Sequence, residues 1–452
     1  MREKGFLKGA IILTIFGIVG KIIGAIYRVP LTRIVGVEGL GVYQMIFPLY
    51  SLLLTISSSA FPNAISKMLS EAYAKNKYDK VKVVLKTAFK ILFICSFICF
   101  AFIVLFSKII AKLQGNFAIW KCYLAIAPSV VFVAFIACFR GYFQAKQNML
   151  PSAISGLVEQ LVKFATGLIF ASVFVKFGVV MGAFGALLGV TLSEIVAFLY
   201  LFIRYRIDLK CDNYKYNSIN KTCIREMLSI TIPITLGGII LPLSQFVDSA
   251  LVVNTLLKIG YSSTTATKMF GITTGVVGSI INMPVVFSLA ISTSVIPAIS
   301  KQNITKQCCV MKTALKSIYI TLILGIVSAL VVFFGSDIII NILYGKSLST
   351  IDIVLSTRLL KISSISIIYL SLVQTTTGVL QGLGKIKTPI ISLAVGVLIK
   401  VFLNILLISN PKINIFGAEI ATIMCFAIAA TINIINIVII GRKGKETQII
   451  AK

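Results

Sequence analysis

Long apolar segments, separated by short charged or Gly- and Pro-containing breaks, recur along the whole chain. Many reach 18 residues or more, the length with which an α-helix crosses about 30 Å of hydrocarbon. The pattern predicts an all-α membrane protein with about twelve transmembrane helices. We place them near residues 8–34, 39–66, 84–107, 119–140, 151–176, 180–203, 225–253, 268–299, 313–334, 353–381, 388–409 and 416–441.

Composition supports a membrane location. Of the 452 residues, 58% are apolar and only 13% are charged. A soluble protein of this length would lack enough polar surface to keep so many apolar side chains out of water. The first apolar run is too long for the core of a signal peptide and has no small-residue cleavage site, so no cleavable signal is expected.

The formal charge of +29 lies mainly in the loops, where it predicts topology and not nucleic-acid binding. With twelve helices, the segments on the side of both termini hold 28 basic residues and those on the other side hold nine. Because short basic loops stay inside, both termini are expected to be cytoplasmic.

The two halves of the chain carry an internal repeat. Similar short motifs recur in the same order, 232 to 238 residues apart, and both halves have an even number of predicted helices. The halves should therefore be two parallel six-helix repeats, an arrangement typical of transporters but also open to a duplicated scaffold. The matched segments are Pro62–Lys67 with Pro297–Lys301, Gly141–Gln144 with Gly378–Gln381, Phe184–Ala186 with Phe416–Ala418, and Pro48 with Pro284.

This repeat predicts the domain boundaries. We expect an N-terminal six-helix domain at 1–205, a cytoplasmic linker at 206–224 and a C-terminal six-helix domain at 225–452. Prolines inside helices remove a backbone hydrogen bond and permit bending, so they are candidate hinges. These are Pro48, Pro233, Pro242 and Pro284.

Four basic residues lie deep inside predicted helices, namely Lys21, Arg28, Lys163 and Lys400. A residue twelve positions into a helix is about 18 Å deep, and a charge facing lipid there costs roughly 2.5–3.5 kcal/mol. We therefore expect these cations to face a wet cavity and to bind an anionic substrate. Two other readings stay open: Arg28 can extend to the headgroups, and Glu159, one turn before Lys163, can neutralise that lysine.

Asp248 is the acidic residue within a span that we consider the best candidate for function. It would act as a counter-ion or as a coupling-ion ligand, and a structural ion pair is equally compatible with its position.

Enzymatic chemistry is not expected. The chain has no histidine, and its cysteines and carboxylates show no metal-site spacing or catalytic pairing. We therefore expect neither a metal nor a cofactor, with transport coupled to the membrane potential, Na⁺ or H⁺.

Several segments in order resemble the stage V sporulation protein B group of polysaccharide-exporter proteins. That group belongs to the superfamily of the lipid II flippases and the multidrug and toxin extruders. The resemblance implies two V-shaped lobes around a central cavity that, in lipid II flippases, is cationic and binds the diphosphate of undecaprenyl-linked sugars. The segments are Gly9–Leu13, Lys21–Gly24, Tyr27–Leu31, Gly39–Gln44, Asp248–Ala250 and Gly378–Gly382.

The chain departs from the family at two places. Ser279 stands where relatives have a basic residue, so the cavity would have one cation fewer. Asp248, Asn404 and Thr422 could correspond to the sodium site of some relatives, but Lys400 would repel a cation there and could replace it.

The resemblance implies a flippase in the bacterial cytoplasmic membrane that exports an undecaprenyl-diphosphate-linked envelope precursor. Expected partners are this substrate, anionic phospholipids and cell-wall synthases, and we expect a monomer. The alternatives are an organic-cation antiporter of the same fold and a non-transporting scaffold for envelope synthesis.

Overall fold

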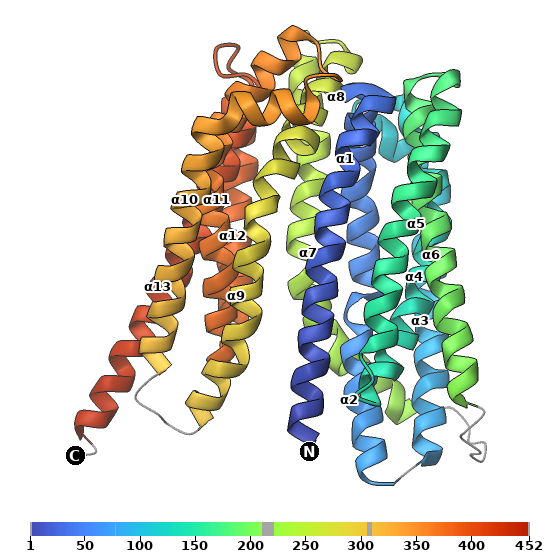
Figure 1. The fold of residues 1–452 in the computed structure, drawn as a ribbon, viewed down its shortest axis with the longest axis vertical. Helices are drawn as coiled ribbons and strands as arrows, with labels where there is room; N and C mark the ends of the chain where they lie inside the picture. Colours follow the sequence, from blue (N-terminus) through green and yellow to red (C-terminus); the bar gives the residue numbers. More distant parts are fainter. Residues whose placement is uncertain (1, 77, 210–220, 305–309, 451–452) are drawn as a thin grey trace. The chain divides into compact units, whose positions relative to one another are not determined.

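The computed structural model describes residues 2–76, 78–209, 221–304 and 310–450, and all regular structure within these ranges is helical (Figure 1). Eleven helical stretches among them are long and apolar enough to span a membrane. The first, Ile12–Ala74, has 63 residues. At 1.5 Å per residue it would measure about 95 Å, three times the hydrocarbon thickness. This stretch therefore accounts for two of the predicted spans.

Gly36 breaks this first stretch. Its backbone has φ 67° and ψ −179°, a conformation outside the helical region that glycine adopts readily because it lacks a Cβ atom. The break lies inside the interval 34–39 where the hydrophobic pattern predicts a boundary between two helices. The stretch labelled α1 (Arg2–Leu54) therefore consists of two helices that meet at a kink at Gly36.

The chain forms two compact units, Met1–Ala250 and Leu251–Lys452. The boundary predicted at 206–224 remains a prediction, and residues 210–220 of that linker lie outside the described residues. The first unit contains α1, η1 (Thr55–Ser59), α2 (Phe61–Ala74), α3 (Tyr78–Leu113), η2 (Phe117–Ile119), α4 (Trp120–Ala145), α5 (Leu150–Phe174), η3 (Val175–Phe177), α6 (Val179–Leu209) and α7 (Lys221–Lys258) up to Ala250.

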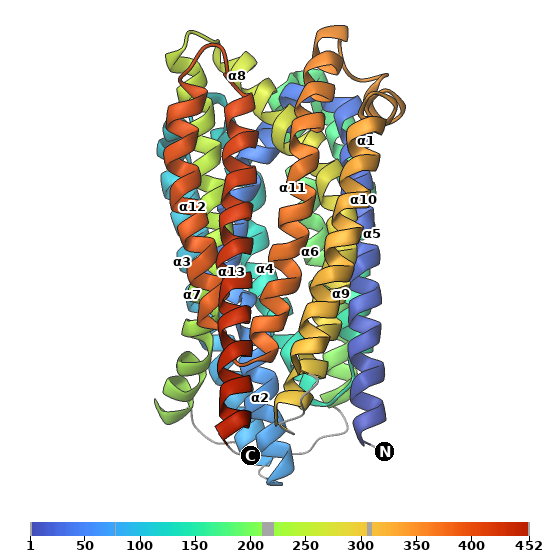
Figure 2. The same cartoon turned by 90° about the vertical axis from the view of Figure 1, so that its left-hand side faces the viewer.

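The second unit continues from the end of α7. Figure 2 shows its long helices, with α12 and α13 side by side as their close packing requires. Its elements are α8 (Ser263–Phe270), η4 (Gly271–Val277), α9 (Gly278–Ile304), α10 (Val310–Tyr344), α11 (Thr350–Gly382), α12 (Lys387–Ile408) and α13 (Phe416–Ile450).

The two units repeat the same helix pairs. In the first, α4 packs against α2, α3 and α6, and α5 packs against α6. In the second, α11 packs against α9, α10 and α13, and α12 packs against α13. Two apolar cores among the described residues lie on corresponding helices, with Ile65 of α2 in one core and Ile299 of α9 in the other. The repeat seen in the sequence is therefore a repeat of packing.

Glycines allow the closest contacts at equivalent places. A Cβ atom on Gly141 would lie 2.8 Å from Ile65 Cβ and 3.0 Å from Pro62 O, and one on Gly382 would lie 2.9 Å from Ile299 Cβ and 3.1 Å from Ile296 O. The structure thus pairs Gly141 with Gly382. The sequence motif had aligned it with Gly378, one helical turn earlier.

The Phe-Gly-Ala motifs serve a second pair of equivalent contacts. Gly185 of α6 lies against the backbone of Phe170 in α5, and Gly417 of α13 lies against Leu407 and Ile408 in α12. A side chain at either glycine would collide with the preceding helix. Close approach of successive helices is a common use of small residues in membrane proteins.

Apolar side chains are also exposed on the outer surfaces of the helices. Leu105 of α3 is 73% exposed and Phe334 of α10 is 76% exposed, and both helices carry many similar residues. Such extended apolar surface is unfavourable in water and favourable against lipid chains. Corresponding helices of the two units therefore present lipid-facing surfaces.

One buried amide joins four helices of the first unit. Gln114, directly after α3, donates from Nε2 to Met45 O in α1 at 2.9 Å and to Ser249 Oγ in α7 at 2.7 Å. The hydroxyl of Tyr123 in α4 donates to Gln114 Oε1 at 2.5 Å. Since Gln114 has no exposed surface, these bonds satisfy an amide that would otherwise be costly to bury.

We expect Gly382→Ala to destabilise the protein by about 1–3 kcal/mol, because the added methyl group forces α11 away from α9. Gly17→Ala is the matched control: nothing lies within 4 Å of its Cβ position, and alanine favours the helix. Thermal unfolding midpoints of the detergent-purified variants measure the difference. Equal midpoints for the two variants would contradict this packing argument.

Gln114→Leu should destabilise the first unit by roughly 2–5 kcal/mol, because it leaves the Tyr123 hydroxyl and the Met45 carbonyl buried without their partner. Tyr123→Phe removes a single donor and should cost only about 1 kcal/mol. The same unfolding measurement ranks the two variants. A larger loss for Tyr123→Phe would show that the amide is not the centre of this network.

Candidate substrate site

Three of the four predicted cations lie in the first unit, where α1 packs against α5. Lys21 and Arg28 are on α1, and Lys163 is near the middle of α5. Lys400 occupies a similar depth of α12, the helix of the second unit that corresponds to α5.

Lys21 is an exposed cation within a largely apolar segment of α1. Among the described residues, no hydrogen-bond acceptor or carboxylate pairs with its ammonium group. A Cβ atom on Gly17, one turn before it, would meet nothing within 4 Å. The surface of α1 beside Lys21 is therefore open at this end.

The next turns of the same helix pack on α5. Cβ atoms on Gly20 and Gly24 would lie 3.4 Å from Gln160 Cγ and Oε1, respectively. Gln160 thus fills the groove that the two glycines leave in α1. These contacts place Lys21 and the polar side chains of α5 on neighbouring helix surfaces.

Arg28 is half-buried two turns after Lys21. Its guanidinium interacts electrostatically with the hydroxyl of Tyr43 and with Lys163. Its position on the α5-facing part of α1 adds positive charge to the surroundings of Lys163.

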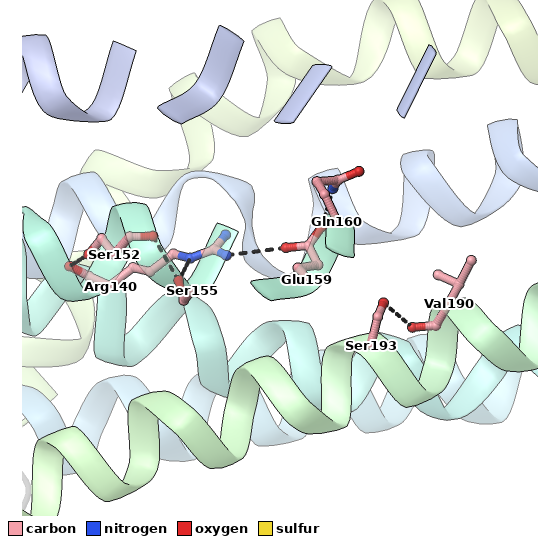
Figure 3. Close-up of polar contacts among 7 residues, drawn as sticks. All are labelled: Arg140, Ser152, Ser155, Glu159, Gln160, Val190 and Ser193. Carbon is pink, nitrogen blue, oxygen red and sulfur yellow. Dashed lines mark hydrogen bonds and ion pairs between the residues drawn. The ribbon is translucent and has the colours of Figure 1, made fainter. Parts of the chain in front are cut away.

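Glu159 is paired with Arg140, the last residue of the helix predicted at 119–140. Arg140 of α4 donates from Nη2 to Glu159 Oε2 at 3.2 Å and from Nε to Ser155 Oγ at 3.1 Å (Figure 3). Gln160 Nε2 donates to the other Glu159 oxygen at 2.9 Å. Both oxygens of this carboxylate are thus engaged.

Lys163 therefore lacks the close partner that one reading of the sequence gave it. No carboxylate of the described residues lies within 4.0 Å of its ammonium group. It interacts over longer distances with Glu159 and with Glu194 of α6. Glu194 is only 5% exposed, and it also interacts with Arg140.

We give the name first-unit cluster to Lys21, Arg28, Arg140, Lys163, Glu159 and Glu194. The last five are linked by the ion pair and the electrostatic interactions described above, and Lys21 lies one turn before Gly24, which packs on Gln160. Four are basic and two are acidic, so the first-unit cluster has an excess of two positive charges. Since the helices that carry it are apolar over most of their length, this excess favours binding of an anion.

Sequence reasoning missed the roles of Arg140, Gln160 and Glu194. Arg140 looked like a topological charge because it ends a predicted helix, and Gln160 and Glu194 had no partner nearby in the sequence. The contacts that reveal their roles join α1, α4, α5 and α6. Only information about which residues of different helices lie close together could have identified these three roles.

The residues proposed for ion coupling fall in different units. Asp248 belongs to the first unit and is 8% exposed, whereas Asn404 of α12 and Thr422 of α13 belong to the second. Asn404 is fully buried one turn after Lys400 on the same helix. The Thr422 hydroxyl donates to Ala418 O at 2.8 Å.

The four candidate hinge prolines all lie inside helices. Pro48 is in α1, Pro233 and Pro242 are in α7, and Pro284 is in α9. Each removes one backbone hydrogen bond from its helix. Pro48 precedes the π-helical turn η1 (Thr55–Ser59). Turns of this kind inside α-helices are frequent at functional sites.

Comparison with known proteins identifies the family. The profile of the family described as "Polysaccharide biosynthesis protein" matches residues 6–303, and the MatE profile matches residues 233–406. Among curated proteins, stage V sporulation protein B of Bacillus subtilis (strain 168) is 29% identical over 430 residues, which cover 94% of this chain and 82% of that protein.

Lipid II flippase MurJ of the same organism is 25% identical over 443 residues, covering 92% of this chain and 79% of the relative. Among solved structures, an inward-facing multidrug resistance MATE family transporter of the MOP superfamily matches with a TM-score of 0.74 and 13% identity. The match covers 95% of this chain and 96% of that one, so the fold is shared over nearly the whole length.

The two helical units, the transmembrane segments and these similarities lead to one assignment. The chain is a multi-pass membrane transporter, not an enzyme, and it belongs to the polysaccharide biosynthesis protein family, within the superfamily that includes MurJ and the MATE transporters.

Proposed function

We propose that this transporter is a flippase that exports an anionic, lipid-linked sugar of the cell envelope across the bacterial cytoplasmic membrane by alternating access. The observation that carries the proposal is the excess of positive charge in the first-unit cluster, including Lys21, which is exposed and has no partner in the part of the chain that the structure describes. An anionic headgroup would neutralise these cations while its lipid tail remains in the bilayer.

The energetic cost of the cluster supports a functional role. Each cation facing hydrocarbon costs roughly 2.5–3.5 kcal/mol, so an excess of two charges would cost about 5–7 kcal/mol without a ligand or water. That is comparable with the whole stability of many proteins. The fold by itself does not need a charged side chain at position 21, because apolar residues flank Lys21 on α1.

An undecaprenyl-diphosphate-linked precursor fits this charge. The relative named lipid II flippase is similar over 92% of the chain, which supports lipid II or a related molecule as the substrate. A diphosphate carries several negative charges, and guanidinium and ammonium groups are its preferred ligands. Lys21, Arg28 and Lys163 would be its ligands in the first unit, and Lys400 is the substrate-binding cation that we propose for the second unit, considered by itself.

The direction of transport follows from the topology that we propose. The loops on the side of both termini hold most of the basic residues, so that side would be cytoplasmic. A membrane potential that is negative inside favours outward movement of an anion by about 2.3 kcal/mol per charge per 100 mV. Bending at Pro48, Pro233, Pro242 and Pro284 would accompany the change of access.

Two further roles are part of the proposal. Asp248, Asn404 and Thr422 would contribute to ion coupling or, for Asp248, to balancing a cation. Anionic phospholipids would contact the basic cytoplasmic loops, and cell-wall synthases would supply or consume the precursor.

We expect the double variant Lys21→Ala/Arg28→Ala to transport a fluorescent undecaprenyl-diphosphate sugar at least about 100-fold more slowly than the unchanged protein. Two charge-assisted contacts are worth about 3–6 kcal/mol together, and each 1.4 kcal/mol corresponds to a factor of ten. Purified protein in liposomes, with the flipped fraction measured by quenching from outside, provides the assay.

Lys385→Ala/Lys387→Ala is the matched control, because it removes two exposed basic residues outside the first-unit cluster. It should transport at nearly the unchanged rate. Normal transport by Lys21→Ala/Arg28→Ala would exclude the anionic-headgroup mechanism.

The MatE match at residues 233–406, which includes Asp248, keeps an organic-cation antiporter as the second candidate. Under that function, Asp248→Asn abolishes export of a fluorescent organic cation and the lipid-linked sugar is not moved. A scaffold role would instead leave both substrates untransported while the protein still captures cell-wall synthases.

A further inference from the structure

Three lysines gather around the single tryptophan of the chain, where α3 meets α4 in the first unit. Lys108 Nζ of α3 lies 5.1 Å from the centre of the Trp120 ring, and Lys121 Nζ of α4 lies 5.8 Å from it. Two ammonium groups from different helices thus approach one ring. Lys112 follows Lys108 by one turn on the same face of α3. We call Lys108, Lys112, Lys121 and Trp120 the hairpin lysine surface.

No acidic residue neutralises these lysines. The sequence has no Asp or Glu from residue 80 to residue 158, which includes the whole region where α3 connects to α4. In the part of the chain that the structure describes, no carboxylate of any other helix lies within 4.0 Å of the three ammonium groups. All three side chains are exposed. The hairpin lysine surface therefore presents three positive charges to its surroundings.

The corresponding hairpin of the second unit, formed by α10 and α11, carries acidic partners for its cations. Lys361 pairs with Asp337 at 2.9 Å, and Lys268 of α8 pairs with Asp352 at 2.7 Å. The same arrangement of helices thus exists with its cations neutralised inside the protein. The fold by itself does not require the excess of positive charge on the first hairpin.

The lysines stand where both helices would leave the hydrocarbon. In α3, 17 uncharged residues separate Lys90 from Lys108, and in α4, 18 uncharged residues separate Lys121 from Arg140. A helix of this length rises about 27 Å, close to the thickness of the hydrocarbon core. Lys108 and Lys121 are therefore the first charges of the headgroup layer on their helices, and Trp120 has the position typical of interfacial aromatic residues.

An apolar stripe continues from the lysines along α3. Leu105, Ile109 and Leu113 are 73%, 55% and 63% exposed, and they follow one another at intervals of one turn beside Lys108 and Lys112. A phospholipid has the same order of groups, with a phosphate at the surface and acyl chains below it. A single lipid molecule can therefore contact the charged and the apolar parts of this surface together.

We propose that the hairpin lysine surface binds the phosphate of an anionic phospholipid, whose acyl chains lie along the apolar stripe of α3. Ammonium groups form charge-assisted hydrogen bonds with phosphate, and the Trp120 ring holds two of them in place. In the orientation proposed above, this lipid belongs to the outer leaflet, opposite the basic cytoplasmic loops. Topology does not explain three lysines there, because the orienting bias places basic residues inside. Such binding does not depend on which substrate the protein transports.

Trp120 makes the test direct, because its fluorescence reports on this surface without interference from another tryptophan. The full-length protein is placed in liposomes that mix phosphatidylcholine and phosphatidylglycerol, with one of the two lipids brominated near the headgroup so that it quenches tryptophan. The two quenching curves give the affinity for phosphatidylglycerol relative to phosphatidylcholine beside Trp120. We expect a preference of at least about fivefold, the contribution of one lysine near an anionic lipid surface.

The variant Lys108→Gln/Lys112→Gln/Lys121→Gln keeps the fluorescent reporter and should reduce this preference to about one. Its matched control removes the same charge from exposed lysines elsewhere on the predicted outer side, and it should keep the full preference. The control is Lys176→Gln/Lys346→Gln/Lys412→Gln. Raising the NaCl concentration from about 0.1 M to about 1 M should weaken the preference of the unchanged protein, because salt screens exposed charges.

Equal quenching by the two lipids in the unchanged protein would overturn the inference, and so would an equal preference in the unchanged protein and the Lys108→Gln/Lys112→Gln/Lys121→Gln variant. Farnesyl diphosphate, a soluble diphosphate probe, should leave the quenching by brominated phosphatidylglycerol unchanged. Displacement of the phospholipid by equimolar probe would assign the surface to a diphosphate ligand and would also overturn the inference.

Discussion

Charge placed among apolar helices is the constraint on which the functional architecture of this protein depends. A cation that faces hydrocarbon loses its hydration, and the loss is not recovered by the packing of its neighbours. The first unit nevertheless carries Lys21, Arg28, Arg140 and Lys163 on three of its helices. Among the described residues, Arg140 forms an ion pair with Glu159, whereas Lys21 and Lys163 have no carboxylate within 4.0 Å. Under the function that we propose, an anionic substrate would supply the balancing negative charge.

The helix contacts around the cluster explain how it is held. Gln160 fills the groove beside Gly20 and Gly24 and at the same time donates to Glu159, so the packing of α1 on α5 is joined to the ion pair with α4. The amide of Gln114 fixes another part of the same unit through α1, α4 and α7. Polar groups within membrane proteins are kept at such sites because their partners are also buried.

The duplicated architecture supplies two similar frameworks but not two similar sites. Equivalent glycines bring α4 onto α2 and α11 onto α9, and the Phe-Gly-Ala motifs bring successive helices together in both units. The corresponding helices α5 and α12 nevertheless differ. Lys163 has Glu159 one turn before it, whereas Lys400 has Gly396, which packs on Cys425 of α13. The two units therefore share a backbone arrangement but differ in the charged residues on their corresponding helices.

The sequence by itself determined the membrane-spanning helices, the repeat and the placement of four cations inside those helices. These properties depend on the length of apolar segments and on 1.5 Å of rise per residue, which are local along the chain. It could not determine that Arg140 pairs with Glu159, that Gly141 corresponds to Gly382, or that Glu194 is buried without a bonded partner. Those features require side chains from different helices to meet, and one helical turn of displacement, as between Gly378 and Gly382, changes which residues do so. Tertiary structure alone decided them, because inter-helix distances depend on packing that no local pattern encodes.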